Sequence, residues 1–183
     1  TLSAMQQWFA TRGPFAAIGI ASFGPLESRI GAAHWGHITQ TTKPGWSNAD
    51  VAGALTALFD CPVGFDTDVN GAALAEYLWG AAQGSCAMLY FTVGTGVGGG
   101  AIIDGQRLHG LSHPEMGHIR LKRHTDDADF AGVCPFHGDC LEGLASGPAI
   151  IARWGKSLSD LPADHVAHDI IAFYLAQTVC TMQ

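Results

Sequence analysis

The sequence carries little charge, and no stretch concentrates charge of one sign. Only 14% of its 183 residues are Asp, Glu, Lys or Arg, and the formal net charge is −7 at pH 7. The nine lysines and arginines are scattered along the chain, whereas surfaces that bind nucleic acid or anionic membranes cluster such residues. We therefore expect no nucleic-acid partner. Hydrophobic residues make up 48% of the chain, which is enough to bury a core and argues against disorder.

Long apolar runs are also missing. No uninterrupted run reaches the roughly 18 to 20 residues that span a bilayer, and the N-terminal TLSAMQQWFATRG lacks the basic start and apolar middle of a signal peptide. The sequence thus predicts a cytoplasmic protein with no membrane partner. Because the chain begins with Thr1 and not with methionine, we expect that the natural start lies further upstream.

Cysteine is sparse and odd in number. The five cysteines do not form the dense, even set of a secreted disulfide scaffold, so in a reducing compartment they are free or bind metal. They are Cys61, Cys86, Cys134, Cys140 and Cys180.

The order of apolar runs and turn signals predicts an α/β protein. Asn48 and Asn70 are expected to cap two of the helices. The first strand is expected to be covered on both faces because its apolar run is nearly continuous. The predicted helices cover residues 2–11, 49–59, 71–79, 141–154 and 166–182. The predicted strands cover residues 15–23, a short stretch from 61, 87–93 and 98–105, with a further candidate at 34–39. The irregular stretch over 106–140 is long enough to indicate a functional loop.

A glycine-rich stretch, FTVGTGVGGG, lies between two predicted strands at residues 91–100. Closely spaced glycines allow successive backbone N–H groups to face one anion, and a threonine hydroxyl adds a donor, so the pattern favours phosphate. The alternative is a glycine-rich β-hairpin with a bulge. Five glycines exceed what a hairpin needs, although the stretch leads into a strand and lacks the helix dipole of other phosphate loops. The candidate phosphate residues are Gly94, Thr95, Gly96, Gly98 and Gly99.

Two aspartates, Asp66 and Asp68, follow the strand predicted from residue 61, in FDTDVNG. Ligands of α/β folds bind at the carboxyl ends of strands. A carboxylate placed there can accept the proton of a substrate hydroxyl that attacks phosphorus. We favour Asp68 as this base because it lies closer to the start of the next helix. The alternative is that both aspartates only cap the turn and the helix.

The stretch VCPFHGDCLEG places Cys134, His137 and Cys140 at a regular spacing of three. Zinc prefers four such ligands in a tetrahedron, and closed Cys and His sites are structural. His113, His118 and His124 are candidates for the fourth ligand, and the spacing does not choose among them. A disulfide between the two cysteines would leave the histidine without a role and needs an oxidising compartment. We therefore favour zinc.

Taken together, these motifs resemble the ROK family of sugar kinases and sugar-responsive repressors, within the actin-like ATPase superfamily. Members carry a GH pair followed by CxCGxxGCxE, whereas this chain has HPEMGH at 113–118 followed by CPFHGDCLE, in which a histidine replaces the middle cysteine at altered spacing. This variant resembles the bacterial fructokinases of the family. Further matching stretches are GIASFGPLE (19–27), TTKPGW (41–46), TDVNGAALAE (67–76), GTGVGGG (94–100) and LEGLASGPAI (141–150).

The resemblance implies a role for each matching residue. Asp68 corresponds to the catalytic base, and GTGVGGG to the second phosphate-binding motif. His118 corresponds to the fourth metal ligand, which gives a structural zinc set of His118, Cys134, His137 and Cys140. The residues assigned to the sugar site are Gly24, Pro25, Asn70, Glu115, His118 and Glu142.

The resemblance also implies the architecture and the reaction. The expected fold is an actin-like ATPase, or ribonuclease H-like, α/β fold with two lobes, incomplete at both termini because the family's first phosphate loop and adenosine motif are absent. Residues 1–70 resemble the end of the small lobe and 71–183 the start of the large lobe, with a zinc-binding loop at 113–142. The implied activity is phosphorylation of a hexose, above all fructose, by ATP with magnesium, in a homodimer. The alternative is a non-catalytic, zinc-stabilised sugar-binding fragment or a relic of a sugar-responsive repressor.

Overall fold

The computed structural model describes residues 1–182, and within them the chain divides into two compact units. The first unit comprises Thr1–Tyr90 and Gly100–Pro114, and the second comprises the remaining described residues. The boundary between these units passes through two strands. The assignment of the two stretches to a small and a large lobe stays a prediction.

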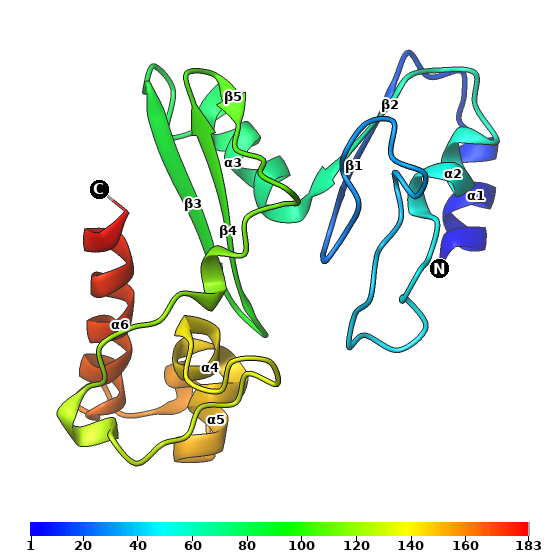
Figure 1. The fold of residues 1–183 in the computed structure, drawn as a ribbon. Helices are drawn as coiled ribbons and strands as arrows, with labels where there is room; N and C mark the ends of the chain where they lie inside the picture. The colour runs from blue at the N-terminus through cyan, green and yellow to red at the C-terminus, as the bar shows by residue number, and fades with distance from the viewer. Residues whose placement is uncertain (183) are drawn as a thin grey trace. The chain divides into compact units, whose positions relative to one another are not determined.

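The first unit is built on a parallel pair of strands (Figure 1). β1 (Ile18–Ser22) pairs with β2 (Val63–Thr67), and Ile20 lies opposite Phe65. Parallel neighbours need a long crossover connection, which here contains α2 (Val51–Thr56), and α1 (Leu2–Ala10) packs against α2. The apolar core of this part is formed by Leu26, Ile38, Val51, Ala52 and Phe65.

Local structure in this part differs from the sequence expectations. β1 alternates between more and less exposed residues, so it is not covered on both faces. Residues 34–39 form only isolated bridges, Leu26 with Ile38 and His37 with Asp50. Asp50, and not Asn48, caps α2 by accepting a hydrogen bond from the Gly53 N–H at 2.7 Å. Asn48 instead has a φ of 59°, which a turn residue of this type tolerates.

α3 (Asp68–Trp79) begins directly where β2 ends. The Thr67 hydroxyl caps it by accepting from the Asn70 N–H at 3.1 Å, so the predicted cap at Asn70 was one turn too late. Two glycines, one in α3 and one in β4, allow this helix to lie close to the neighbouring strands. A Cβ at Gly71 would lie 2.7 Å from the Ala21 Cβ, and one at Gly100 would lie 2.5 Å from the Val69 carbonyl oxygen. The first turn of α3 is therefore closely packed against β1 and β4.

The second sheet contains three strands in the order β3, β4, β5. These are β3 (Ala87–Val93), β4 (Val97–Ile103) and β5 (Gln106–Arg107). β4 and β5 are antiparallel, and Asp104 and Gly105 between them both have positive φ angles, of 48° and 76°. Two-residue hairpin turns require this conformation.

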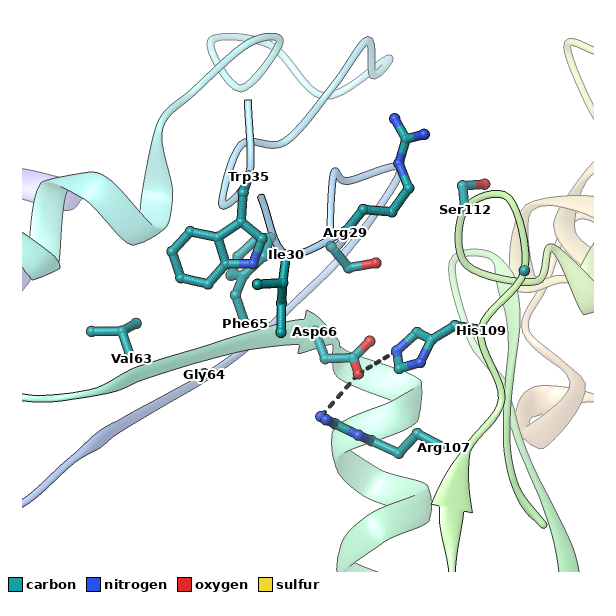
Figure 2. Close-up of a pocket in the computed structure, with 12 residues that line it drawn as sticks. Arg29, Ile30, Trp35, Val63, Gly64, Phe65, Asp66, Arg107, His109 and Ser112 are labelled. Atoms are coloured by element: carbon teal, nitrogen blue, oxygen red, sulfur yellow. Dashed lines mark hydrogen bonds and ion pairs between the residues drawn. The ribbon is translucent and has the colours of Figure 1, made fainter. Parts of the chain in front are cut away.

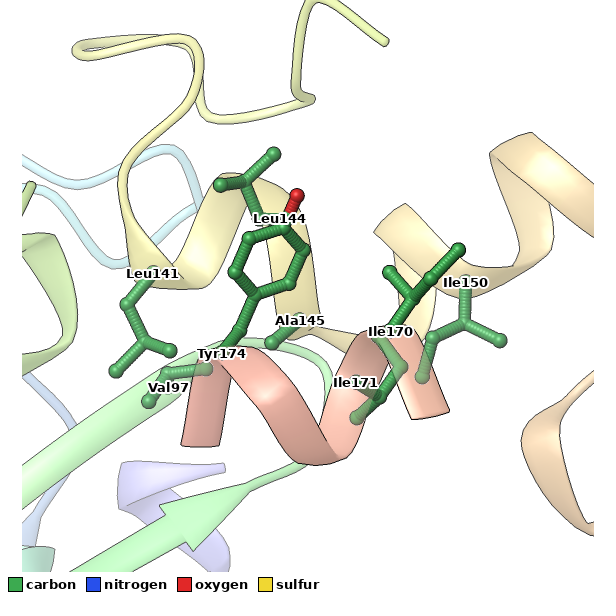
Figure 3. Close-up of a cluster of buried hydrophobic side chains, with 8 residues drawn as sticks. All are labelled: Val97, Leu141, Leu144, Ala145, Ile150, Ile170, Ile171 and Tyr174. Carbon is green, nitrogen blue, oxygen red and sulfur yellow. The ribbon is translucent and has the colours of Figure 1, made fainter. Parts of the chain in front are cut away.

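The second unit is held together by helices near the end of the chain. α4 (Leu141–Ala145) packs against α5 (Gly147–Trp154) and α6 (Ala167–Thr181). The predicted helix over 141–154 is divided because Ser146 is extended and caps α5 through the Ala149 N–H. Figure 3 shows Tyr174 of α6 directed at α4. The buried core is formed by Val97, Leu141, Leu144, Ala145, Ile150, Ile170, Ile171 and Tyr174.

The long stretch predicted to be irregular has little regular structure after β5. It contains two single 3₁₀ turns, η1 (Met116–His118) and η2 (Thr125–Asp127), and a third, η3 (Leu158–Asp160), follows α5. Across residues 1–182, none of the helices combines the length and the apolar character that crossing a membrane requires.

Candidate functional site: a carboxylate, a glycine turn and a cysteine–histidine cluster

Asp68 is the first residue of α3, at the carboxyl end of β2. Its side chain is exposed, and one carboxylate oxygen accepts from the Val69 N–H at 2.9 Å. The N-terminus of a helix stabilises negative charge because its first N–H groups point outward. An accessible carboxylate at this position is suited to act as a general base for a ligand hydroxyl.

Asp66 has the opposite environment. Its residue is only 4% exposed, and the two carboxylate oxygens accept four interactions. Oδ1 accepts from the Thr67 N–H at 2.8 Å and from the Asn70 Nδ2 at 2.9 Å. Oδ2 lies 3.0 Å from the Arg107 guanidinium and 2.9 Å from the His109 Nε2. This carboxylate is fully engaged within the protein and has no capacity left for a substrate proton.

Asp66 also lies on a cavity of about 340 Å³ within the first unit (Figure 2). Trp35 and Phe65 provide aromatic surface there, and Arg107 and His109 approach Asp66 from the segment that follows β4. The same segment continues to His113, whose ring packs against Gly24, because a Cβ at Gly24 would lie 3.0 Å from the His113 Nε2. The segment 107–113 therefore contacts both the β2–α3 junction and the loop of Gly24 and Pro25.

The glycine-rich stretch divides into a turn and a strand. Gly94, Thr95 and Gly96 form the turn between β3 and β4, and the Gly94 N–H donates to the Gly96 carbonyl at 2.8 Å. Gly98 and Gly99 lie in β4. A Cβ at Gly99 would lie 2.7 Å from the Met116 Cβ, so close packing accounts for that glycine. The part available to a phosphate group is the exposed turn at 94–95 and its neighbour Gly96.

Glu142 holds this turn from the side of α4. Its Oε2 accepts from the Val97 N–H at 2.9 Å, and a Cβ at Gly96 would lie 2.6 Å from the same oxygen. The Gly147 N–H also donates to the Gly94 carbonyl at 2.7 Å. The helices that follow the cysteine-rich stretch thus position the glycine turn. The sequence assigned Glu142 to the sugar, and in the structure its carboxylate contacts the turn.

The four predicted metal ligands lie together. One ligand atom from each of His118, Cys134, His137 and Cys140 falls within 4.8 Å of the others. Bond lengths of about 2.3 Å to sulfur and about 2.0–2.1 Å to nitrogen imply ligand separations of about 3.3–3.8 Å in a zinc tetrahedron. The His118 Nδ1 lies 3.4 Å from the Cys140 Sγ and 3.7 Å from the Cys134 Sγ, and the His137 Nδ1 lies 3.8 Å from the Cys134 Sγ. These separations fit a tetrahedral zinc ion.

The surroundings of the cluster favour a structural metal. Cys134 and Cys140 are buried, and burial raises the pKa of the Cys140 thiol to about 11. Zinc binding needs the thiolate, and a bound cation supplies the charge that stabilises it. His118 directs Nδ1 to the cysteines, and its Nε2 lies 3.8 Å from the Glu115 carboxylate. A carboxylate beside the second nitrogen is the usual support of a zinc-bound histidine.

The other two candidate histidines have different contacts. His124 packs its ring on Phe173, and its Nδ1 accepts from the Asp126 N–H at 3.1 Å. His113 lies against Gly24. Within the part of the chain that the structure describes, the metal cluster therefore contains His118 and neither of these two.

Sequence reasoning did not find the partners of Asp66. Arg107 and His109 are about 40 positions away from it, and nothing in their local sequence distinguishes them from surface residues. The one available signal was the position of Asp66 within a predicted strand, because a carboxylate buried in a strand requires cationic or donor partners.

The structure thus contains an exposed carboxylate at a helix start, a glycine turn held by a glutamate, and a cluster suited to structural zinc. Solved structures with the same α/β arrangement define the class. A ROK hexokinase from Thermus thermophilus superposes with a TM-score of 0.76 at 29% identity, covering 99% of this chain and 64% of that one. A ROK glucokinase from Streptomyces griseus, solved with glucose and AMPPNP, gives 0.62 at 27% identity, covering 82% and 47%. The fold is that of the actin-like ATPases, as the sequence predicted.

The family follows from the sequence match. The ROK family profile matches residues 2–182, and the chain belongs to this family. A fructokinase from Zymomonas mobilis is 57% identical over 171 residues, which cover 92% of this chain and 57% of the relative. A fructokinase from Lactococcus lactis is 45% identical over 161 residues, which cover 88% and 54%. The chain therefore spans about half the length of these curated relatives.

Proposed function

We propose that the protein carrying this sequence is a sugar kinase that transfers the γ-phosphoryl group of ATP to a hexose, with fructose as substrate and fructose 6-phosphate as product. The observation that carries the proposal is the exposed Asp68 carboxylate at the first position of α3, in a chain that is 57% identical to a fructokinase. The related structure with glucose and AMPPNP supports a sugar and a nucleotide as ligands of this fold.

Asp68 would act as the general base. Its carboxylate accepts the proton of the sugar hydroxyl while the hydroxyl oxygen forms a bond to the γ-phosphorus and the bond from phosphorus to the leaving oxygen of ADP breaks. Catalysis of this kind consists mainly of alignment and charge stabilisation. The Thr67 cap and the Val69 N–H fix the backbone and the carboxylate at this position. Asn70 and the loop of Gly24 and Pro25 are proposed to contact the sugar, together with Glu115 and His118.

The phosphates would bind at the turn of Gly94, Thr95 and Gly96. Its exposed backbone and the Thr95 hydroxyl supply neutral donors, and Glu142 and Gly147 hold the turn from α4 and α5. Magnesium bound with ATP would neutralise charge on the phosphates. Gly98 lies in β4 beside Gly99, and Gly99 contributes through close packing against Met116.

Zinc would be held by His118, Cys134, His137 and Cys140 and would have a structural role. It would connect η1 to the start of α4, since Cys140 is the N-cap residue of that helix. The proposals that the complete protein is a homodimer and acts in the cytoplasm are supported by the resemblance to the family.

The test of the activity is an assay of ADP formation coupled to oxidation of NADH, with fructose as the varied substrate. It should be run on this chain and on the complete gene product that contains it. Fructose-dependent ADP formation supports the kinase. Saturable fructose binding without ADP formation by either protein would favour the alternative, a sugar-binding module without catalytic activity. That alternative is considered because the match covers only 57% of the relative's length.

The Asp68→Asn variant tests the base. We expect turnover in the complete protein to fall about 10²–10⁴-fold, the usual contribution of general base catalysis, while fructose affinity changes little. Asp104→Asn is the matched control, because Asp104 is exposed at the β4–β5 turn and asparagine also tolerates its positive φ. Turnover of Asp68→Asn within threefold of the control would exclude Asp68 as the base.

A further inference from the structure

We propose that Asp66, together with Arg107 and His109, positions the base Asp68. The inference rests on the proposed kinase function and adds a positioning role that the exposed carboxylate alone does not reveal. Figure 2 shows the Asp66 carboxylate with Arg107 and His109 directed at it from the segment after β4. Both contacts are made to the same oxygen, Oδ2, at 3.0 Å and 2.9 Å.

The other oxygen of Asp66 binds the residues on both sides of Asp68. Oδ1 accepts from the Thr67 N–H, which precedes the base, and from the Asn70 side chain, which follows it by two positions. One buried carboxylate therefore fixes the backbone before the base and the first helical turn after it.

The Asn70 amide depends on this contact. An ionised aspartate only accepts hydrogen bonds, so the atom of Asn70 that faces Asp66 is the Nδ2. The Asn70 Oδ1 is buried and has no hydrogen-bond partner within residues 1–182. Asn70 itself is 1% exposed. Asp66 is thus the side chain that holds the Asn70 amide in a fixed orientation.

Arg107 and His109 in turn hold Asp66. A carboxylate with 4% exposure is unfavourable unless donors surround it, and the guanidinium and the imidazole N–H supply them. The ring of His113 in the same segment packs against Gly24. The segment 107–113 thereby links the base to the loop proposed to lie beside the sugar.

A double-mutant cycle in the complete protein tests the inference. We expect Asp66→Asn to lower kcat for fructose at least tenfold with the KM for ATP within threefold. In the Asp68→Asn background the same change should lower the residual turnover less than twofold, because a residue that acts through Asp68 has no effect once the base is absent. A merely structural role predicts equal losses in both backgrounds, and that result would overturn the inference.

A second pair of variants covers the case in which Asp66→Asn does not fold. Arg107→Lys keeps a cation beside the carboxylate and should retain at least half of the turnover, whereas Arg107→Gln should lose at least fivefold. Asp104→Asn is again the control, because Asp104 is exposed at the β4–β5 turn, and it should leave turnover unchanged. Equal activity of the two Arg107 variants would contradict the proposal. If the wild-type protein shows no fructose-dependent turnover, the kinase proposal fails first and this inference with it.

Discussion

At the scale of single residues, Asp127 is the centre of a buried polar network in the second unit. Its Oδ2 lies 2.6 Å from the Arg153 guanidinium and accepts from the Tyr174 hydroxyl at 2.7 Å. Arg153 also donates to the Leu144 carbonyl and packs over Phe130. Burial, together with the hydrogen bond to Asp127, raises the pKa of Tyr174. The network ties η2 to α5 and α6 without contacting the residues of the proposed reaction.

Removing the charge of Asp127 should therefore destabilise the fold. Asp127→Asn leaves the Arg153 guanidinium buried, at 6% side-chain exposure, without its counter-ion, and breaking a buried pair in this way costs about 3–5 kcal/mol. The measurement is the free energy of unfolding from urea denaturation monitored by circular dichroism.

The neighbouring Asp126 provides the control for this prediction. It lies on the same 3₁₀ turn but is exposed, and a surface change of this kind alters stability by about 0.5 kcal/mol or less. If Asp127→Asn and Asp126→Asn were equally stable, the network would contribute nothing beyond a surface ion pair.

Some of the individual site residues could be identified from the sequence. Asp68 and the four cluster residues occur in short, contiguous motifs, so the amino-acid sequence alone is enough to propose their chemistry. Arg107, His109 and Arg153 could not be identified in this way. Their roles depend on carboxylates 26 to 43 positions away, and single-sequence patterns contain no information about such pairs.

At the scale of elements, the stretch between η1 and α4 has little secondary structure of its own. Cys134 and Gly138 exchange backbone hydrogen bonds of 2.9 and 3.2 Å around a tight turn, and Gly138 has a φ of 62°. The end of this stretch is connected to the residues after η1 by a hydrogen bond from the Leu141 N–H to the Ile119 carbonyl at 3.0 Å and by an isolated bridge between Arg120 and Cys140. A metal ion bound by residues at both ends would add a further connection.

Metal content and removal test this role. We expect about one zinc per chain after dialysis, and removal by a chelator should speed trypsin cleavage after Arg120, Lys122 or Arg123 because the stretch is no longer held. The readout is elemental analysis together with a time course of proteolysis. Less than about half an equivalent of zinc in the wild-type protein would count against the site.

Two serine variants distinguish the ligand set from other thiols. Cys134→Ser should lose zinc and show the rapid cleavage without a chelator, because Cys134 belongs to the cluster. Cys180→Ser should behave like the wild type, since Cys180 is exposed on α6 and outside the cluster. Loss of zinc from both variants alike would indicate unspecific binding to cysteine.

The sequence predicted the fold class correctly, but it predicted the residues at which helices begin and end less well. The α/β fold was confirmed, because apolar periodicity over long stretches is a strong signal. Both predicted asparagine caps were wrong, and Asp50 and Thr67 cap those helices instead. Several residues near a helix start can each cap it, and the choice depends on where the preceding backbone enters. Ser146 likewise divides a helix that periodicity alone reads as continuous.

At the scale of the whole molecule, charge separates the kinase from the repressor alternative. The net charge is −7, with nine basic residues dispersed over the sequence, whereas DNA binding depends on clustered cations. We expect no binding of this chain to a fluorescent duplex of mixed sequence at 150 mM salt by anisotropy, up to about 10 μM protein. Saturable binding below that concentration would support the repressor relic, and a basic DNA-binding protein serves as the positive control.

The assignment of residues 1–70 and 71–183 to two lobes stays a prediction. The two compact units of the structure separate within β3 and β4. Sequence motifs mark ligand contacts, and compactness depends on which elements pack together. Gly100 illustrates the difference. Its motif predicts phosphate binding, whereas the Val69 carbonyl beside it leaves no room for a side chain.

The short helix α4 couples the metal cluster to the glycine turn. Cys140, a member of the metal cluster, is its N-cap residue, and Glu142, two positions later, holds the Val97 N–H of the glycine turn. Five residues of helix therefore join a cation site to the proposed anion site. By linkage, whatever free energy a bound metal adds to the binding of an anion at the turn, the anion must add equally to the binding of the metal.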